Sequence, residues 1–332
     1  MNTFIFTCGD INGIGPEIII KTLNRIAANS MSNFVIVCPR NVFEKEIQKN
    51  RPNFTYNINT CLRQDKQEDV QVLDIGFYKH EYGLPTDYSG NAAYNAIEIA
   101  LNYSDNLLKT AIITAPISKK ALSLAKINFP GHTEMLANWF KVKNYVMMFL
   151  SNKLNASLLT IHEPIKKVSR LITPKLLNEK LDTIISSMNI DFRIINPQIA
   201  LLGLNPHCGE EGIIGTEEIN TVKPFLFNYK FKQNIAGPFS PDAFWGRKLY
   251  KQFDMIVGMY HDQVLIPFKL LTLDKGVNFT AGLPIVRTSP DHGTAYEIAG
   301  KGIANESSML EAYYYAKKIL NNRQLHEKKS KL

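Results

Sequence analysis

Short apolar runs alternate with longer amphipathic stretches along most of this 332-residue chain. The runs of apolar or β-branched residues lie at 4–9, 34–39, 109–116, 155–162, 198–207 and 254–262. The stretches with helical spacing lie at 15–29, 89–104, 173–188 and 240–253. Strands that are apolar throughout are typical of sheets that helices cover on both faces, so the alternation predicts a layered α/β fold.

Two of the helical stretches begin with a hydroxyl residue followed by proline, at Thr173-Pro174 and Ser240-Pro241. This pair predicts a side-chain N-cap and a proline in the first helical position. The length of the chain favours about two domains. No internal repeat or low-complexity linker marks a boundary between them, so the boundary has to come from topology.

Bulk composition argues against several classes of protein. Hydrophobic residues make up 45% of the chain and charged residues 20%, as in ordinary globular proteins. The longest apolar runs are far shorter than the ~18 residues that would span a bilayer, and the first ten residues lack the basic segment of a secretory signal. We therefore expect a cytoplasmic protein without membrane association. The four cysteines show no CxxC spacing, which predicts free thiols.

The formal net charge of +8 raises the question of a nucleic-acid partner. The charge comes mostly from lysine and is spread along the chain, and only the tail at 326–332 is locally dense. A dispersed lysine background is typical of a solvated surface rather than a nucleic-acid face. We expect no nucleic-acid partner, although the positive field would attract an acidic substrate.

Three of the seven histidines, His162, His207 and His261, follow the carboxyl ends of expected strands. In open α/β sheets functional residues gather where strands end, so three distant strand ends can meet. Three imidazoles with open positions suit a divalent metal ion. The alternative is that each is an ordinary hydrogen-bonding loop residue, because no HxH or HExxH spacing links them. Acidic residues that could orient the imidazoles follow nearby, at Glu163, Glu210 and Asp262.

Cys208 directly follows His207 in the stretch NPHCGE. The pair could be a thiol-imidazole unit, two ligands of one metal, or a working histidine beside a bystander. A reactive thiol needs a lowered pKa and a partner base. Adjacent residues in an extended chain point to opposite sides, so we expect Cys208 to face away when His207 faces the site.

An anion site is predicted where FPGHTEMLA, at 129–137, enters a helix. Gly131, His132 and Thr133 lie just before the helical run, where free backbone N–H groups and the helix dipole favour an anion. The alternative is a plain N-cap made by Thr133 with Glu134 in the first turn. The two interpretations are compatible.

Lys269 and Arg287 are cations in mostly apolar surroundings. Burying such a cation is costly, so we expect a bound anion or a protein carboxylate near each, with a structural ion pair as the alternative. Asn278 and Asp242 complete a polar set that suits a site. Asp242 could also merely favour the start of a helix by dipole complementarity.

The glycine-rich stretch GDINGIGPE, at 9–17, follows a strand run and begins a helical stretch, as anion-binding turns do. It lacks the GxGxxG spacing and the acidic residue expected of a conventional dinucleotide-binding turn. In the alternative interpretation, Gly13 and Gly15 only permit a tight turn between strand and helix.

Together these segments resemble the 4-hydroxythreonine-4-phosphate dehydrogenase family of vitamin B6 biosynthesis. The segments that carry the resemblance are GDINGIGPE, TAPISKKAL, FPGHTEMLA, LNPHCGEEG, GPFSPDAFW, YHDQVLIPFK, GVNFTAGLPIVRTSPDHGTA and IAGKGIA. They occur in the order of the family from residue 9 to residue 304, which is far more specific than any single motif.

The resemblance implies an α/β fold like that of isocitrate and isopropylmalate dehydrogenases, with two lobes around a cleft. We expect residues 1–130 plus 280–332 to form the first lobe, which carries the cofactor loop. Residues 131–279 are expected to form the second lobe, with the metal histidines and the dimer contacts. The resemblance also implies a homodimer whose active sites are shared between subunits.

The resemblance also implies roles for individual residues. The metal ligands are His162, His207 and His261, and the metal is Zn, Mg or Co, although imidazole also suits Ni or Fe. The residues implied to bind the phosphorylated substrate are His132, Thr133, Lys269, Asn278 and Arg287. The residues expected to bind NAD, or NADP in its place, are Gly13, Gly15, Asp291, His292, Gly293, Thr294 and Asn305.

The implied reaction is the NAD-dependent oxidation and decarboxylation of 4-phosphooxy-L-threonine to 3-amino-2-oxopropyl phosphate. Lys269 is the candidate for stabilising the alkoxide or moving its proton, with Asp242 as a polar partner. Three alternatives stay open: a dehydrogenase for threonate or erythronate 4-phosphate, a phosphate acyltransferase, and a basic nucleic-acid-binding protein.

Overall fold

The structure is a computed structural model that describes residues 1–28, 30–62, 68–104, 106–129 and 131–330. Three features expected from the sequence end outside these residues: the helix expected at 15–29, the first segment of the first lobe, expected to end at residue 130, and the basic tail at 326–332. The chain folds as two compact units. Unit 1 contains Met1–Lys141 and Leu283–Leu332, and unit 2 contains Val142–Gly282.

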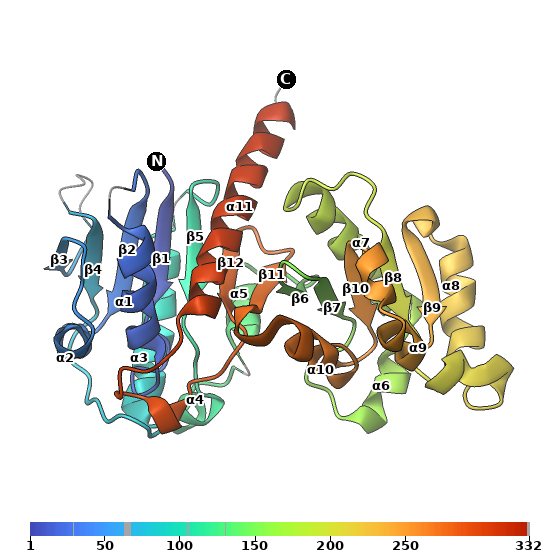
Figure 1. The fold of residues 1–332 in the computed structure, drawn as a ribbon, viewed down its shortest axis with the longest axis horizontal. Coiled ribbons are helices and arrows are strands. Elements are labelled where there is room, and N and C mark those ends of the chain that lie inside the picture. Colours follow the sequence, from blue (N-terminus) through green and yellow to red (C-terminus); the bar gives the residue numbers. More distant parts are fainter. Residues whose placement is uncertain (29, 63–67, 105, 130, 331–332) are drawn as a thin grey trace. The chain divides into compact units, whose positions relative to one another are not determined.

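Unit 1 is a parallel sheet with helices packed against it (Figure 1). Its described strands follow the order β3-β4-β2-β1-β5-β12, and every printed register within this group is parallel. The strands are β1 (Thr3–Thr7), β2 (Asn33–Cys38), β3 (Tyr56–Asn59), β4 (Val70–Asp74), β5 (Thr110–Thr114) and β12 (Val286–Pro290). The helices are α1 (Gly15–Ile26), α2 (Arg40–Lys49), α3 (Asp87–Asn102), α4 (Lys119–Leu124), α5 (His132–Trp139) and α11 (Ser307–Ser330).

Unit 2 has a mixed sheet in the order β11-β6-β7-β10-β8-β9. β6 is antiparallel to both of its neighbours here, whereas the pairs from β7 to β9 are parallel. The strands are β6 (Val146–Leu150), β7 (Asn155–Leu158), β8 (Ile199–Leu202), β9 (Ile235–Phe239), β10 (Met255–Gly258) and β11 (Val277–Ala281). The helices are α6 (Ile165–Leu171), α7 (Pro174–Ile190), α8 (Lys223–Asn228), α9 (Pro241–Gly246) and α10 (His261–Thr272).

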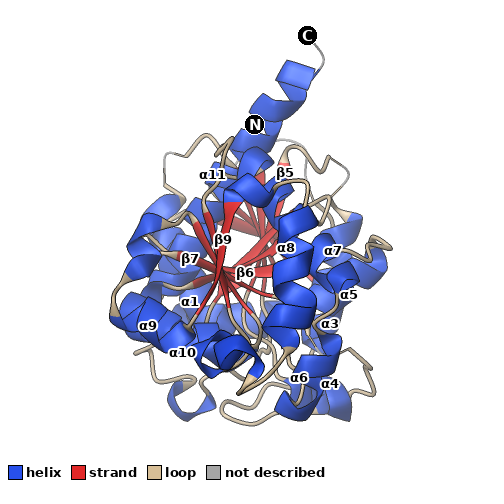
Figure 2. Ribbon diagram, turned by 90° about the vertical axis from the view of Figure 1, so that its right-hand side faces the viewer, coloured by secondary structure: helices blue, strands red, loops and turns tan. Residues whose placement is uncertain are grey.

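Each unit contains both helices and strands, which Figure 2 distinguishes by colour. In unit 1 the strands β1 and β5 are buried almost throughout, as their continuous apolar sequences require. In unit 2 the core joins strand residues with Phe244 from α9 and Phe268 from α10, both fully buried. The α/β fold expected from the alternating pattern is therefore confirmed.

Local signals explain where several helices begin. Thr173 accepts a hydrogen bond from the backbone N–H of Leu176, and Pro174 opens α7 as the sequence predicts. The equivalent prediction for Ser240 is wrong, because its hydroxyl makes no cap and instead donates to Asp242. Pro241 still opens α9.

Two expected strands are shorter than their apolar runs. β8 ends at Leu202, so His207 is not on a strand but in a turn at Pro206–Gly212. β7 ends at Leu158, four residues before His162. The chain crosses from unit 1 to unit 2 at Val142, so residues 131–141 belong to unit 1, whereas the expected division placed them in the second lobe. No helix among the described residues is both long and apolar enough to cross a bilayer.

Candidate functional site

Arg287, which the sequence singled out as a cation in apolar surroundings, is buried in unit 1. It lies on β12, which pairs with β5, and its side chain is 2% exposed. Its Nε and Nη2 atoms donate to the hydroxyl of Thr114 at 3.1 and 2.7 Å. Burial lowers the pKa of Arg287 to about 10, and the charge of Glu134 partly opposes this shift. The guanidinium therefore stays charged at neutral pH in a place where an anion would stabilise it.

His132 is the first residue of α5, and the charge of Arg287 acts on its imidazole. Burial, and then the charge of Arg287, hold the pKa of His132 well below its usual value. The imidazole is therefore neutral at pH 7, and its buried Nε2 atom has no hydrogen-bond partner among the described residues. A buried ring nitrogen without a partner is costly, so it favours a ligand here.

The start of α5 has no side-chain cap. Its N-cap is Gly131, which has no side chain that could bond to the backbone of the first turn. Thr133 lies inside the helix and is not the N-cap, so the alternative of a plain Thr133 cap is wrong, while Glu134 does lie in the first turn as expected. A neutral imidazole, a buried guanidinium and an uncapped helix start together suit a phosphate group.

The glycine-rich turn at 9–17 packs against the segment that was expected to bind NAD. The backbone N–H of Ile14 donates to the carbonyl oxygen of Thr294 at 3.0 Å. A Cβ at Gly13 would lie only 2.7 Å from that oxygen. A Cβ at Gly15 would overlap the carbonyl oxygen of Cys8. Close packing within unit 1 therefore explains why both positions need glycine.

Asp10 joins this turn to the same segment. Its carboxylate is fully buried and accepts hydrogen bonds from the hydroxyls of Tyr296, at 2.7 Å, and Ser89, at 3.0 Å. Burial raises its pKa, while these hydrogen bonds and one from the backbone N–H of Asn12 oppose the shift. The carboxylate connects the turn, α3 and the 291–305 loop.

The other residues expected to bind the cofactor lie along this irregular loop in unit 1. The backbone N–H of Asp291 donates to the hydroxyl of Ser308 at 3.1 Å. The Oδ1 atom of Asn305 accepts from the backbone N–H of Ser307, the first residue of α11, at 2.9 Å. The Nδ1 atom of His292 lies 3.0 Å from the carbonyl oxygen of Gly293, and a Cβ at Gly293 would meet nothing within 4 Å. The loop thus offers open space at Gly293 beside a fixed backbone.

Two of the three strand-end histidines in unit 2 lie together. The ring centroids of His162 and His261 are 5.7 Å apart. Two imidazoles on one tetrahedral zinc ion, each with a Zn–N bond of about 2.1 Å, would have centroids about 5 Å apart. The Nδ1 atom of His261 lies 2.7 Å from Oδ1 of Asp262, and a carboxylate in this place favours the tautomer with its proton on Nδ1, in which Nε2 can bind a metal. This pair fits a shared metal ion.

His207 does not complete a metal-binding group in the structure. Within the described ranges, no group of three His, Cys, Asp or Glu side chains is arranged to hold an ion. His207 is exposed, and its charge contributes to the lowered pKa of Asp242, although the hydrogen bond from Ser240 is the larger cause. Of the three expected ligands, His162 and His261 therefore lie together, whereas His207 lies near Asp242.

The turn that carries His207 has an unusual backbone. His207 and Cys208 have φ values of 50° and 53°, and the left-handed conformation continues through Gly209 to Glu211. A left-handed residue other than glycine costs about 1–2 kcal/mol, so the turn must be held by its surroundings. The carboxylate of Glu218 supplies part of that support: it is fully buried, and its Oε1 accepts from the backbone N–H of Leu204 at 2.7 Å and of Asn205 at 2.8 Å.

Cys208 is half-buried, and its sulfur points to the backbone of β9. Its Sγ lies 3.4 Å from the carbonyl oxygen of Pro238, and a Cβ at Gly203 would lie 2.7 Å from this sulfur. Burial, and then the charge of Glu218, raise the pKa of the thiol. A raised pKa is the opposite of what a nucleophilic thiolate needs.

The proposed catalytic pair is not formed in the structure. Lys269 lies in the last turn of α10 and is exposed, so the burial argument made from its apolar neighbours was wrong. No hydrogen bond or ion pair among the described residues joins Lys269 to Asp242, which is exposed and bonded to Ser240. Asn278 on β11 is half-buried, and its Oδ1 atom is buried without a hydrogen-bond partner in the described part of the chain.

Sequence reasoning missed several residues that support these groups. Glu218 and Glu17 are buried carboxylates whose oxygens accept from backbone N–H groups of distant segments. Both occur in helical or turn contexts where a glutamate is ordinarily exposed. Only the unusual density of glycine around them could have drawn attention to them.

Comparison with known proteins agrees with this architecture. A family model described as "Pyridoxal phosphate biosynthetic protein PdxA" matches residues 30–316. A 4-hydroxythreonine-4-phosphate dehydrogenase from Bacteroides thetaiotaomicron is 39% identical over 96% of this chain and 88% of its own length. The crystal structure of a 4-hydroxythreonine-4-phosphate dehydrogenase from Klebsiella pneumoniae superposes with a TM-score of 0.80 at 32% identity, covering 96% of this chain and 98% of that one.

A further relative carries a different substrate in its name. A protein from Oceanobacillus iheyensis with the provisional name D-threonate 4-phosphate dehydrogenase is 34% identical over 93% of this chain and 95% of its own. The match to the family model and the identity over nearly the whole chain decide the family, and the resemblance seen in the motifs is confirmed. This chain belongs to the PdxA family of pyridoxal phosphate biosynthetic proteins.

Proposed function

We propose that the protein catalyses the NAD-dependent oxidative decarboxylation of 4-phosphooxy-L-threonine to 3-amino-2-oxopropyl phosphate. The observation that carries this proposal is the anion site of unit 1. There the buried guanidinium of Arg287 and the neutral imidazole of His132 lie at the uncapped start of α5, as the phosphate of such a substrate requires. The names of the relatives support the same substrate.

The phosphate contributes binding energy away from the reacting carbon. Arg287, held by Thr114, offers a charged donor in a fixed position, and its charge acts on His132, the first residue of α5. Energy gained at a remote phosphate can orient the hydroxyl group that is oxidised. Burial and the charge of Arg287 keep the pKa of His132 low, so its imidazole would meet a phosphate oxygen as a neutral hydrogen-bonding group.

We propose that a divalent metal is held by His162 and His261, with His207 as the third ligand. Bound there, the ion would lower the pKa of the substrate hydroxyl and stabilise negative charge during decarboxylation. Asp262 orients the ring of His261 through Nδ1. Zn, Co or Mg is the proposed metal; an imidazole set favours Zn or Co over Mg.

Lys269 and Asn278 are also proposed to bind the substrate. Lys269 would stabilise the alkoxide or move its proton, and Asp242 would act beside His207 rather than as the hydrogen-bonded partner of Lys269. NAD supplies the hydride acceptor, and NADP is the alternative. The loop at 291–305 and the turn at Gly13 and Gly15 would position it.

The protein is proposed to act as a homodimer with shared active sites. The support is a row of exposed apolar residues on and after α10, where Ile266, Leu270 and Leu273 are 57%, 74% and 74% exposed. Large exposed apolar side chains that lie together are typical of an interface. Light scattering after size exclusion would report the mass, and a monomer at micromolar concentration would refute this part.

The direct test of the function is absorbance at the NADH band with 4-phosphooxy-L-threonine as substrate. We expect NADH to form, to stop after chelation and to return when a divalent metal is added. Absence of NADH with every metal tried, for folded protein, would refute the proposal.

The name of the Oceanobacillus relative supports a second candidate, the oxidation of D-threonate 4-phosphate. Both substrates carry a phosphate for the Arg287 site, and they differ in an amino group against a hydroxyl group. The kcat/KM values for the two substrates under the same metal would separate them. If kcat/KM is higher for D-threonate 4-phosphate than for 4-phosphooxy-L-threonine, the second candidate replaces the first.

A further inference from the structure

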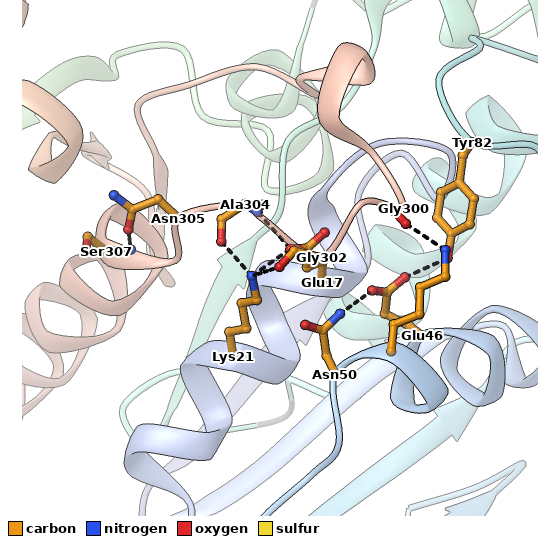
Figure 3. A network of polar contacts seen from close by, with 11 residues as sticks. Glu17, Lys21, Glu46, Asn50, Tyr82, Gly300, Gly302, Ala304, Asn305 and Ser307 are labelled. Atoms are coloured by element: carbon orange, nitrogen blue, oxygen red, sulfur yellow. Dashed lines mark hydrogen bonds and ion pairs between the residues drawn. The ribbon is translucent and has the colours of Figure 1, made fainter.

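The second half of the 291–305 loop has no regular structure of its own, yet two helices hold it in place (Figure 3). It runs through Gly300 and Gly302, whose φ values of 74° and 72° are left-handed. A backbone of this kind depends on outside contacts to keep a single conformation. In unit 1 those contacts come from α1 and α2.

Glu17 and Lys21 of α1 form an ion pair that is hydrogen-bonded to the backbone of the loop (Figure 3). The Nζ atom of Lys21 lies 2.7 Å from Oε1 of Glu17 and donates to the carbonyl oxygens of Gly302, at 3.0 Å, and Ala304, at 2.8 Å. The same Oε1 accepts from the backbone N–H of Ala304 at 2.8 Å. Donor and acceptor of Ala304 are thus both bound by this one pair.

The ion pair of Glu17 and Lys21 is largely buried, which strengthens its hydrogen bonds. The side chain of Glu17 is 1% exposed and that of Lys21 22% exposed, so water competes little for their hydrogen bonds. Hydrogen bonds to ionised groups are roughly twice as strong as those between neutral groups. A surface ion pair at the same spacing would have no comparable effect on a distant loop.

From α2, a second set of contacts holds the beginning of the segment. Lys49 donates to the carbonyl oxygen of Gly300 at 2.7 Å and lies over the ring of Tyr82, 4.2 Å from its centroid. The hydroxyl of Tyr82 donates to Glu46 at 2.9 Å. A Cβ at Gly300 would lie 2.7 Å from the ring of Tyr82, so the loop and the ring are in direct contact.

We propose that Glu17 and Lys21 are positioning residues that fix residues 300–305 in the conformation that binds the dinucleotide. The inference rests on the proposed function, in which the 291–305 loop binds NAD. A loop that is already ordered loses less conformational entropy when the ligand binds, and this gain appears as affinity. Neither side chain needs to touch the dinucleotide, because both act through the loop backbone.

A matched ion pair elsewhere in unit 1 separates this role from ordinary helix stabilisation. Arg40 and Glu44 form an i,i+4 pair on α2 with the same 2.7 Å distance, but both are exposed, and neither side chain bonds to the loop. Lys21→Met and Arg40→Met each remove one charge from an i,i+4 pair. Only Lys21→Met removes hydrogen bonds to the carbonyl oxygens of the loop.

The first measurement is hydrogen exchange of the intact protein without NAD. In Lys21→Met and Glu17→Gln we expect the amides of residues 300–305, that of Ala304 above all, to exchange about tenfold faster. Exchange in β1 and β5 should stay unchanged, and Arg40→Met should behave as the unmodified protein. Unchanged exchange of residues 300–305 in Lys21→Met would overturn the proposal.

The second measurement is the KM for NAD against kcat. If the competent loop is populated in about a tenth of the Lys21→Met molecules, the KM for NAD rises about tenfold while kcat stays within about a factor of two. Lys21→Arg, which keeps the charge and two donors, should recover most of the affinity. An unchanged KM for NAD in Lys21→Met would refute the positioning role.

Failure of the proposed function gives a different result. If the unmodified protein forms no NADH in the absorbance assay and does not bind NAD in a calorimetric titration, both the proposed function and this inference are refuted. If the unmodified protein uses NAD and Lys21→Met does so equally well, only the inference falls. Should Glu17→Gln not fold, Lys21→Met and Lys49→Met, both at less buried positions, carry the test.

Discussion

Gly15 begins α1 where the helix packs against the residues that follow β1 and β5. A Cβ there would overlap the carbonyl oxygen of Cys8 and lie 3.1 Å from Cβ of Ala115. Since both neighbours belong to the buried sheet region, they cannot move cheaply. We expect Gly15→Ala to lower the free energy of unfolding by about 1–3 kcal/mol in urea denaturation.

Gly246 provides the control for this prediction. It ends α9, and a Cβ there would meet nothing within 4 Å. Gly246→Ala should change stability by less than about 1 kcal/mol, with a gain favoured by the smaller entropy of the unfolded chain. Equal losses in the two variants would contradict the role assigned to close packing at Gly15.

His80 makes a prediction about pH. Burial, and then the charge of Lys45, lower its pKa from 6.5 to about 4 in the folded protein. Between these values the unfolded chain binds a proton that the folded protein does not, so stability falls as the pH is lowered through this window. The ring is partly exposed, so the contribution is about 1–2 kcal/mol rather than that of the full shift.

His80→Phe keeps a ring beside Tyr82, whose centroid lies 4.3 Å from that of His80. Unfolding free energies of both proteins at pH 7 and pH 4.5 would check the prediction. We expect the phenylalanine variant to lose less stability between the two pH values. The same loss in both proteins would show that His80 does not contribute.

His207 and Cys208 are neighbours with different expected roles. His207→Ala should abolish metal-dependent NADH formation, because it removes a proposed ligand. Cys208→Ala should retain most activity, since its sulfur packs near Pro238 and Gly203 and its pKa is raised. Steady-state kinetics with added metal distinguishes them. Full activity of His207→Ala would remove His207 from the metal set.

At the scale of elements, the turn at Pro206–Gly212 depends on Glu218. The Oε1 atom of Glu218 accepts from two backbone N–H groups, while its Oε2 accepts from Nδ2 of Asn205 at 2.9 Å. In Glu218→Gln an amide NH2 group in place of Oε2 would face the Nδ2 donor of Asn205. Two donors would then face each other, and the hydrogen bond from Asn205 would be lost. We expect metal affinity to fall about ten- to a hundredfold, the usual effect of losing a residue that orients a ligand.

Glu211→Gln is the matched control, because Glu211 is exposed on the same turn. Competition with a coloured chelator would measure the affinities of both variants. The control should bind metal as the unmodified protein does. If Glu218→Gln also binds metal normally, the turn is held by other contacts.

Several elements could be predicted because their signals are local. The apolar runs at 4–9 and 34–39 became β1 and β2, and Thr173-Pro174 opens α7. The strands predicted to run up to His162 and His207 are shorter in the structure, because apolar residues continue beyond the last hydrogen bond of the sheet into loops. Ser240 shows the same limit, since its hydroxyl had a competing acceptor in Asp242.

At the scale of the whole molecule, each unit has a core of its own. Phe268 of α10 is fully buried in the core of unit 2, with its ring centroid 5.8 Å from that of Phe149. Phe268→Ala should lower the stability of unit 2 by about 3–5 kcal/mol, through lost burial and the cavity left behind. Hydrogen exchange of β6 and β10 would report the loss.

Ile195, which is 80% exposed in the same unit, provides the control. Ile195→Ala should change stability by less than about 0.5 kcal/mol. A similar loss in both variants would mean that the assigned core does not hold unit 2 together.

The sequence by itself determined the layered α/β class, the family and the types of residue in the candidate site. These follow from periodicity, capping and ordered motifs, which are properties of short segments. Only the tertiary structure decided which residues meet. It brought Arg287 to Thr114 and His162 to His261, left Lys269 exposed, and joined Glu17 and Lys21 to a loop more than 280 residues away in sequence. The reason is that such contacts depend on strand order, register and packing between distant segments, and local patterns do not encode these directly.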